Sequence, residues 1–187
     1  MKKRFYKFVN LVLLCCAMHA NAQTGINCQK HFSAEFDPAP FFQKGYSVAA
    51  GYEFAHWRVS ANIFSAELPS FAVQHDWNVK IQTGSALRLQ YYFNEERKGV
   101  FTGVQAGVLT MNYKKEGKTE ATTVTQFALT PTAGYRWFPF SNNGIYLMPA
   151  AGVGFTLSTS GDVYSGTEKY DQFKPAFIAA LHIGCRF

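Results

Sequence analysis

Residues 175–187 read PAFIAALHIGCRF, and apolar side chains occupy every second position of this stretch. The odd-numbered positions are Pro175, Phe177, Ala179, Leu181, Ile183, Cys185 and Phe187. Successive side chains of a β-strand point to opposite faces, so these residues form one apolar face. The opposite face becomes small or polar toward its end, where His182, Gly184 and Arg186 lie. We therefore predict a β-strand whose apolar face runs to an aromatic last residue.

The same period of two recurs through the rest of the chain. We expect strands at 29–37, 45–54, 57–66, 84–93, 100–113, 123–137, 144–157 and 173–187. In the first of them Phe32 and Ala34 alternate with Ser33 and Glu35, which is typical of a strand with one apolar and one polar face.

The connections between the expected strands alternate in length. Three are tight, at 55–56, 94–99 and 138–143, and four are longer, at 38–44, 67–83, 114–122 and 158–172. In an antiparallel series this alternation places the short turns at one end and the long loops at the other. That arrangement is typical of an up-and-down barrel.

The first 22 residues have the pattern of a secretory signal peptide. Their basic residues are Lys2, Lys3, Arg4 and Lys7, and a short apolar core follows at 11–18. Ala20-Asn21-Ala22 fits a small-x-small cleavage site. We therefore expect residues 1–22 to be removed and residues 23–187 to form one domain.

Removal of this segment changes the charge of the chain. The whole sequence has 18 basic and 12 acidic residues, and four of the basic residues lie in the signal segment. The mature chain would keep 14 basic and 12 acidic residues, which is a net charge of +2 instead of +6. The basic excess therefore gives no support to nucleic-acid binding, and we expect no nucleic-acid partner.

The alternating last strand and its final Phe187 resemble the last strand of bacterial outer-membrane β-barrels. The whole chain is similar to small barrels of the OmpA-transmembrane or OmpX type. Residues 135–140, which read YRWFPF, also resemble small outer-membrane barrel proteins of Bacteroidetes type. The resemblance implies an all-β, eight-stranded antiparallel transmembrane barrel with four longer external loops and three short periplasmic turns.

The resemblance also implies a location and partners. Both termini would be periplasmic, in the outer membrane of a Gram-negative-type bacterium. Phe187 would be the assembly signal read by the barrel assembly machinery, and the barrel would be embedded in outer-membrane lipid. We expect a monomer.

Charged residues on the inward faces of the expected strands are the main candidate site. They are Glu35, Glu53, Arg58, Arg88, Arg136, His182 and Arg186. An eight-stranded barrel is just wide enough for side chains to fill it, so we expect a lumen ion-pair network with a structural role. The alternative is a narrow, gated ion path lined by the arginines.

Cys28 would open the first strand and Cys185 lies near the end of the last, so both would lie near the same rim. A disulfide between them is one interpretation, and two separate small apolar residues are the other. The histidines lack metal-ligand spacing, so we expect no metal and no cofactor. Pro131 and Pro149 lie inside expected strands, as does Pro175, and we expect bulges or local breaks at all three.

Loops 67–83, 114–122 and 158–172 hold the recognition signals that the sequence offers, because binding residues favour loops on rigid scaffolds. We expect a non-enzymatic role in envelope integrity or in binding a ligand or protein through these loops. One alternative is passage of small or hydrophobic solutes, as in OmpW-type barrels, through a lateral opening near Pro131 and Pro149. Another is a lipid-modifying enzyme that depends on His182.

Overall fold

The computed structural model describes residues 30–140, 144–165 and 168–187. Its main strands are β1 (His31–Phe36), β2 (Tyr46–Phe54), β3 (Trp57–Glu67), β4 (Trp77–Tyr92), β5 (Gly99–Lys115), β6 (Ala121–Arg136), β7 (Ile145–Thr159) and β10 (Ala176–Arg186). The connections contain α2 (Ala39–Phe42), η1 (Ser70–Ala72) and a hairpin of β8 (Tyr164–Ser165) and β9 (Glu168–Lys169). No helix in the described residues is both long and apolar enough to cross a membrane. The expected signal peptide and Cys28 lie outside the described residues.

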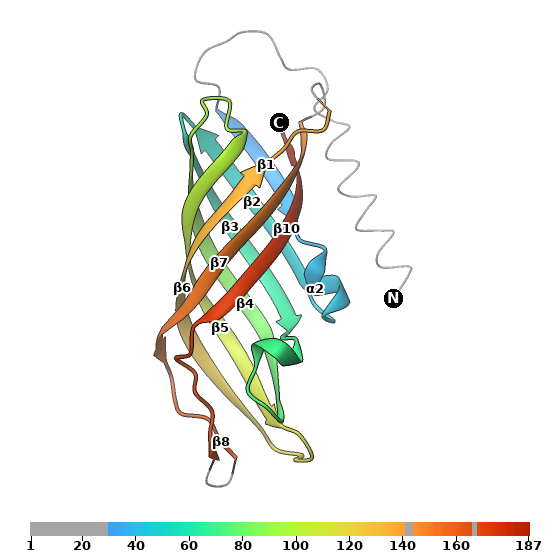
Figure 1. Cartoon of the computed structure of the whole chain (residues 1–187), viewed down its shortest axis with the longest axis vertical. Coiled ribbons are helices and arrows are strands. Elements are labelled where there is room, and N and C mark those ends of the chain that lie inside the picture. Colours follow the sequence, from blue (N-terminus) through green and yellow to red (C-terminus); the bar gives the residue numbers. More distant parts are fainter. Residues whose placement is uncertain (1–29, 141–143, 166–167) are drawn as a thin grey trace.

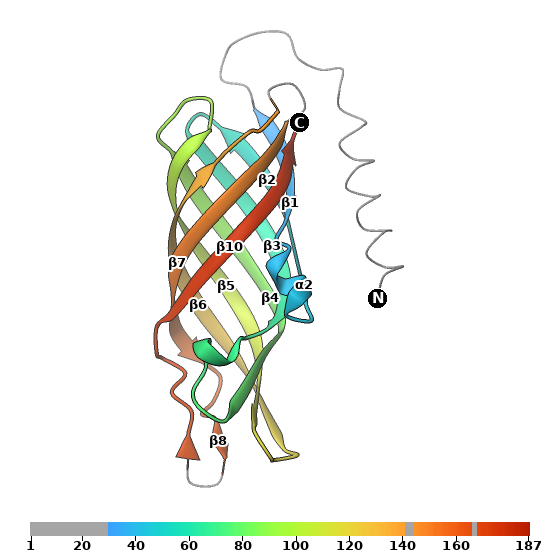
Figure 2. The same ribbon diagram turned by 45° about the vertical axis from the view of Figure 1, so that its right-hand side comes forward.

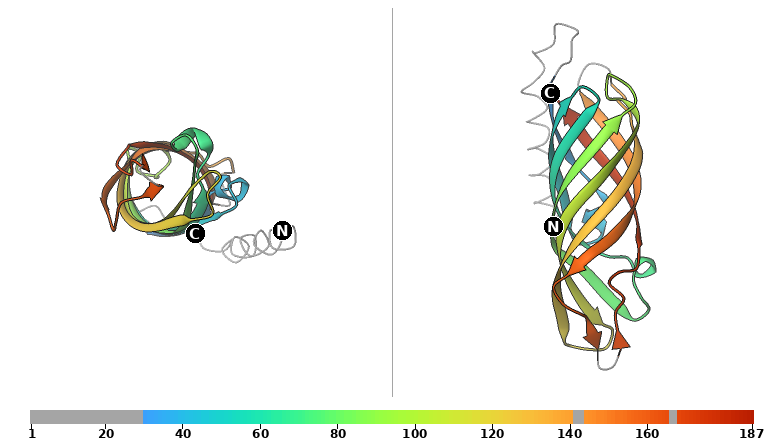
Figure 3. Two further views of the ribbon diagram at one scale, coloured as in Figure 1. Left: turned by 90° about the horizontal axis from the view of Figure 1, so that it is seen from below. Right: turned by 90° about the vertical axis from the view of Figure 1, so that its left-hand side faces the viewer.

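The main strands form a closed antiparallel barrel in the order β1-β10-β7-β6-β5-β4-β3-β2 (Figure 1). The ring is visible when the molecule is viewed from its long-loop end (Figure 3). The last strand closes on the first, because the Phe32 amide donates to the Phe187 carbonyl at 2.8 Å and the reverse bond measures 2.9 Å. The predicted eight-stranded up-and-down barrel is confirmed.

The two faces of the barrel wall differ in polarity. In β3, Arg58, Ser60 and Asn62 point inward and are buried, whereas Trp57 and Val59 point outward and are exposed. The other large apolar side chains exposed on the outer face include Phe32, Ile63, Leu87, Leu89, Phe93, Val108, Tyr135, Trp137 and Phe177. A polar interior under an apolar exterior reverses the pattern of water-soluble proteins and is typical of barrels that face lipid.

β4 is longer than the sequence predicted. It begins at Trp77, so the second half of the predicted loop 67–83 is strand. The pairing of β4 with β5 shifts register between Ile81 and Thr83. A bulge adds one residue and changes which parity faces inward, so Trp77 is buried on one side of it and Arg88 on the other. Before the bulge, odd-numbered residues point inward, whereas even-numbered residues point inward after it. The alternating pattern that predicted a strand from residue 84 therefore does not extend to the residues before the bulge.

Of the other two predicted recognition loops, 114–122 is shorter than predicted, whereas the connection after β7 runs from residue 160 to residue 175, because β10 begins at Ala176 and not at residue 173. The connection between β5 and β6 is residues 116–120 instead of 114–122. The segment predicted as loop 158–172 begins inside β7 and contains the β8–β9 hairpin. The neighbouring strands β4 to β7 therefore extend beyond the rest of the barrel at the long-loop end (Figure 1).

Pro131 and Pro149 both interrupt the seam between β6 and β7. The residue pairs between these strands skip both prolines. Across this seam odd-numbered residues exchange their backbone bonds, as Trp137 and Leu147 do at 2.8 Å in each direction. A proline at an odd position therefore removes a donor from the ladder. Pro175 lies just before β10, outside the strand.

Candidate functional site

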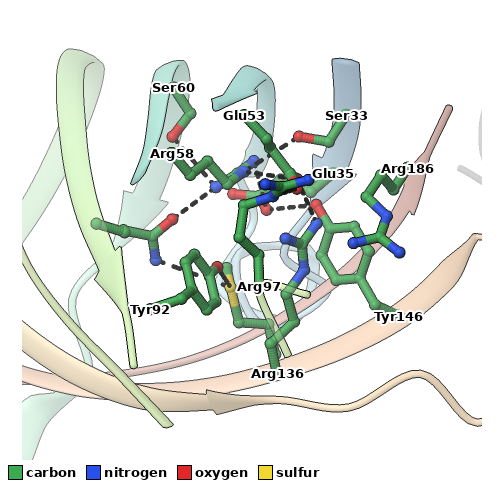
Figure 4. A network of polar contacts seen from close by, with 12 residues as sticks. Ser33, Glu35, Glu53, Arg58, Ser60, Tyr92, Arg97, Arg136, Tyr146 and Arg186 are labelled. Atoms are coloured by element: carbon green, nitrogen blue, oxygen red, sulfur yellow. Dashed lines mark hydrogen bonds and ion pairs between the residues drawn. The ribbon is translucent and has the colours of Figure 1, made fainter. Parts of the chain in front are cut away.

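Charged side chains gather inside the barrel (Figure 4), and Glu53, Arg58 and Arg136 lie close to the ends of their strands at the short turns. Six of the seven residues predicted for the lumen are buried there: Glu35, Glu53, Arg58, Arg88, Arg136 and His182. They come from six different positions on β1, β2, β3, β4, β6 and β10, where strand alternation points them inward. Two carboxylates organise the cluster, and each one contacts several cations.

Glu35 connects β1 to four other strands. Its Oε2 atom lies 3.0 Å from Arg58 Nη2, and its Oε1 atom lies 2.7 Å from Arg88 Nη1. The Tyr146 hydroxyl donates to Oε2 at 3.0 Å. His182 Nδ1 lies 4.0 Å from Oε1. One fully enclosed carboxylate therefore contacts side chains of β3, β4, β7 and β10.

Glu53 is the second centre of the network. Arg136 Nη2 lies 2.6 Å from its Oε1 atom, and Arg97 Nε lies 3.2 Å from Oε2. Arg58 Nε is 3.7 Å from Oε1, so Arg58 lies between the two carboxylates. β2 and β6 lie four places apart in the ring of strands, so the Glu53–Arg136 pair spans the barrel from wall to wall.

Arg97 belongs to the network but was not predicted. It lies in the turn between β4 and β5, where alternation gives no inward or outward direction. Its backbone has a φ of 52°, a left-handed conformation that costs roughly 1–2 kcal/mol for a residue other than glycine. Its Nη1 donates to the Ala55 carbonyl at 2.6 Å, and its Nε pairs with Glu53. These bonds hold the turn over the end of the lumen.

Four arginines face two carboxylates, so the network has an excess of positive charge. Aromatic rings around Arg136 stabilise its guanidinium group by cation–π contacts. The Arg136 guanidinium carbon lies 3.8 Å from the centre of the Tyr146 ring. The rings of Phe138 and Tyr92 follow at 5.1 Å and 5.5 Å. Arg136 Nε and Nη1 have no hydrogen-bond partner among the described residues, so cation–π contacts are their main stabilising interaction.

Neutral oxygens complete the coordination of the other arginines. Arg58 Nε donates to Ser33 Oγ at 3.1 Å, and its Nη1 donates to Gln90 Oε1 at 2.8 Å. Arg88 Nε donates to Gln105 Oε1 at 3.3 Å. Almost every charge is thus paired or hydrogen-bonded, which is the condition under which a buried ionic network is tolerated.

Two glycines make room for this network. A Cβ atom at Gly51 would lie 2.7 Å from Arg58 Nη2. A Cβ atom at Gly184 would lie 2.3 Å from Cζ of Tyr146 and 2.8 Å from the Ala34 carbonyl oxygen. The long side chains of Arg58 and Tyr146 therefore lie flat on backbone that carries no side chain.

Arg186, the seventh predicted residue, lies at the rim of the barrel. Its Nη1 donates to the Glu96 carbonyl at 2.9 Å, and its guanidinium carbon lies 4.4 Å from the Phe138 ring centre. Cys185 is buried in β10. Its expected partner Cys28 is outside the described residues, so the disulfide stays a prediction. Among the described side chains no group of three or more His, Cys, Asp or Glu could hold a metal ion.

A second cluster, here called the long-loop cluster, closes the opposite end of the barrel. Its buried members are Trp77, Val79, Met111, Tyr113, Val124, Val163 and Tyr170. The Tyr170 ring packs 4.8 Å from the Tyr113 ring and 5.3 Å from the Trp77 ring. Gln126 donates to both the Tyr113 hydroxyl at 2.8 Å and Gln172 Oε1 at 2.8 Å. The last loop therefore packs against the extension of β4, β5 and β6.

Polar contacts fix the β8–β9 hairpin on this cluster. Trp77 Nε1 donates to Glu168 Oε1 at 3.3 Å, and Lys115 forms an ion pair with the same carboxylate. The Lys115 contact, followed by that from Trp77, lowers the pKa of Glu168 below its ordinary value. The Asp171 amide donates to Gln74 Oε1 at 3.4 Å. All three predicted recognition loops thus meet at one end of the molecule.

The similarity of this chain to known proteins lies in its fold. No family model and no curated protein matches the chain. The chain is similar to the N-terminal β-barrel domain of Pseudomonas aeruginosa OprF, with a TM-score of 0.50 and 13% identity over 84% of this chain and 96% of that chain. Neisserial surface protein A gives a TM-score of 0.45, with 11% identity over 84% of this chain and 94% of that chain. A major outer membrane protein from Thermus thermophilus gives 0.48, with 14% identity over 85% of this chain and 100% of that chain. The chain therefore has the fold of eight-stranded outer-membrane barrels.

Proposed function

We propose that this chain is an outer-membrane barrel that conducts no ions and acts without catalysis, in envelope integrity or in binding a surface partner. Its exposed apolar side chains suit a lipid environment, since transmembrane β-strands require an outward apolar face. The short turns would face the periplasm and the long loops the exterior. External partners would meet the surface formed by the β8–β9 hairpin and the extended strands.

The ionic network is the observation that carries this proposal. Glu53 and Arg136 connect opposite walls at 2.6 Å, and Tyr146 connects β7 to Glu35 on β1. These contacts fill the lumen near the short turns with side chains that are held from several directions. An ion path along the axis would require these pairs to separate, and that would leave buried charges without a partner.

Conductance across a planar bilayer tests the closed lumen. We expect the reconstituted native protein to give no discrete current steps. The double variant Glu53→Ala with Arg136→Ala, which removes the pair that spans the lumen, should give steps if it inserts, and so provides the control. Steps of similar size from the native protein would contradict the proposal.

Complementation in cells tests the role in the envelope. Cells that lack the chain should become more sensitive to detergent, and the native chain should restore resistance. A variant with Trp77→Ala and Tyr170→Ala loosens the long-loop cluster without changing the lumen. Restoration by this variant would assign the role to the barrel itself, whereas failure by a correctly inserted variant would assign it to the external surface. Unchanged sensitivity in cells without the chain would contradict an envelope role.

A further inference from the structure

The wall of the barrel is incomplete between β1 and β10. β10 pairs with β7 along its length, from Ala176 to Cys185. Its pairing with β1 covers only the four positions from Ile183 to Arg186. Within the described residues, the part of β10 from 176 to 182 therefore has a strand neighbour on one side only. In Figure 2, β1 lies beside the upper part of β10, and α2 is set apart from its lower part.

The sequence itself ends this seam. Phe32 exchanges both backbone bonds with Phe187, so the even-numbered residues of β1 are the ones that bond to β10. The next even positions beyond β1 are Pro38 and Pro40. Neither proline has an N–H group, so β1 cannot extend along β10 with a complete ladder. The chain instead turns through Pro38, the N-cap residue, into α2.

The β10 side chains from 176 to 181 are apolar or small, and at the short-turn end of the opening the Asp37 carboxylate accepts a hydrogen bond from the Leu181 amide. Phe177 points outward and is 89% exposed. Ile178 lies on the inward face, with its Cδ1 3.1 Å from the position of a Cβ at Gly154, yet it is 42% exposed. Gly152, opposite Ile178 on β7, also adds no side chain to the inner wall. On the inner wall the side chains of Thr130 and Thr132 lie beside Gly152, whereas Ile178 stays accessible next to the stretch of β10 that has no second strand neighbour.

The height of the opening places it beside lipid. A transmembrane β-strand spans the hydrocarbon core with roughly 9–11 tilted residues. Counted back from Phe187 at the short-turn rim, that length ends near Phe177. The open part of β10 then lies in the half of the apolar band nearer the long loops. With the orientation proposed above, this half is the outer leaflet.

We infer that this opening, here called the β10 window (residues 176–181 of β10, facing Pro38 and α2), admits one hydrocarbon chain of an outer-leaflet lipid. Neighbouring strands lie about 4.8 Å apart, so one missing strand leaves room for a single extended chain. The window is bordered by Phe177 and Leu181 on its outer face and by Ile178 on its inner face. The ionic network lies between this site and the short turns, so the chain enters from the side and does not cross the barrel. The inference rests on the proposed membrane location.

Quenching of tryptophan fluorescence by brominated lipid tests the window. The three native tryptophans, Trp57, Trp77 and Trp137, are replaced by Phe, and Ile178→Trp is introduced. The protein is reconstituted in vesicles of phosphatidylcholine with brominated acyl chains. In a second protein, which also lacks the three native tryptophans, Phe177→Trp reports direct lipid contact at nearly the same height along the barrel as position 178. A protein that retains only native Trp77, which is buried in the long-loop cluster, reports a buried position without lipid contact.

We expect the tryptophan from Ile178→Trp to lose as large a share of its fluorescence as that from Phe177→Trp, and much more than Trp77. Adding Pro38→Val and Pro40→Val restores two N–H groups along the seam. This closing variant should reduce quenching at position 178 to the level of Trp77, with quenching at 177 unchanged. A mobility shift on heating before gel electrophoresis verifies folding, and Ala176→Trp, also on the inward face, replaces Ile178→Trp if that variant fails to fold.

The outcomes separate the two proposals. Strong quenching at 177 with weak quenching at 178 would overturn the window and leave the membrane location intact. Weak quenching at both positions would overturn the membrane location and the window together. Weak quenching at 178 combined with a dimer on unheated gels would show that a second copy of the chain occupies the opening, which also overturns the lipid chain as occupant.

Discussion

Glu53 is the residue on which the largest number of buried cations depends. Its side chain is fully enclosed and contacts Arg58, Arg97 and Arg136. Glu53→Gln keeps the shape of the side chain and removes its charge. We expect the free energy of unfolding to fall by about 3–5 kcal/mol, because the arginines would remain buried without their counter-charge. Urea titration of the protein in vesicles, followed by fluorescence, measures the change.

The matched control for this prediction is Glu67→Gln. Glu67 pairs with Lys44 at 2.8 Å, but the Lys44 side chain is 77% exposed. Loss of such a surface pair should change stability by less than about 1 kcal/mol. Equal losses for Glu53→Gln and Glu67→Gln would mean that the buried network does not stabilise the barrel.

The members of the network differ in how far the sequence could predict them. Glu35 and Glu53 follow from strand parity, because each stands between apolar residues that face outward. Arg97 could not be predicted, since a turn residue has no parity and its side chain enters the lumen only through an unusual backbone conformation. Arg186 has the correct parity but lies too near the rim to reach Glu35. The odd or even position of a residue in its strand predicts whether its side chain points inward. Its height along the barrel axis decides which charged side chains come into contact.

At the scale of elements, pairing with a neighbouring strand fixes the inward or outward direction of side chains where the local alternation of the sequence does not. The stretches on either side of the β4 bulge each alternate, but in opposite phase, with Trp77 inward before it and Arg88 inward after it. No single alternating pattern covers both, so the sequence suggested a loop where the strand continues. The partner strand β5 fixes the bulge, because its own alternation runs unbroken past Met111.

The β8–β9 hairpin should respond to acid. Its contact with Lys115 lowers the pKa of Glu168 from an ordinary value of 4.5. A lowered pKa in the folded state means that the ionised carboxylate stabilises the hairpin above about pH 4.5, and that this contribution is lost as the pH falls through the lower folded value. We expect limited proteolysis within residues 160–172 to accelerate below pH 4.5, while the barrel stays resistant.

Glu168→Gln separates this carboxylate from the rest of the hairpin. The variant should be cleaved faster at neutral pH and should show a smaller increase on acidification. The remaining increase would come from Asp162, whose pKa is lowered by Lys169, its ion-pair partner at 2.8 Å. Identical pH profiles for the native chain and Glu168→Gln would contradict a role of this contact in holding the hairpin.

At the scale of the whole molecule, the two ends of the barrel are closed by different physical means. Near the short turns, charged pairs connect opposite walls through a lumen that eight strands leave just wide enough for side chains. At the long-loop end, aromatic rings of the long-loop cluster pack under the last loop. Between them, Pro38 and Pro40 end the seam with β1, so in the described part of the chain residues 176–182 of β10 have a strand neighbour on one side only. We therefore expect the barrel to be closed along its axis, with the proposed β10 window in its side wall.

The cost of placing a charge on the outer apolar band should depend on the depth of the residue in the bilayer. Leu87 lies near the middle of β4 and is 63% exposed on the outer face. In a bilayer, arginine at mid-depth on the lipid face of a barrel costs about 2–4 kcal/mol, whereas arginine near an interface costs about 0–1 kcal/mol. We therefore expect Leu87→Arg to lower the free energy of unfolding in vesicles by the larger amount. Val100→Arg, beside a short turn on the same outer face, should cause only the smaller loss.

A third position locates the opposite edge of the band. Leu157, at a bulge near the long-loop end of β7, is 53% exposed, so Leu157→Arg should again be mild. A maximum at Leu87 between two small losses would place the bilayer centre at the height of the lumen network, beside the buried Arg88. Equal small losses at all three sites would mean that the outer face does not contact lipid. A maximum at Leu157 would shift the bilayer toward the long loops, and it would move the β10 window from the outer leaflet to the bilayer centre.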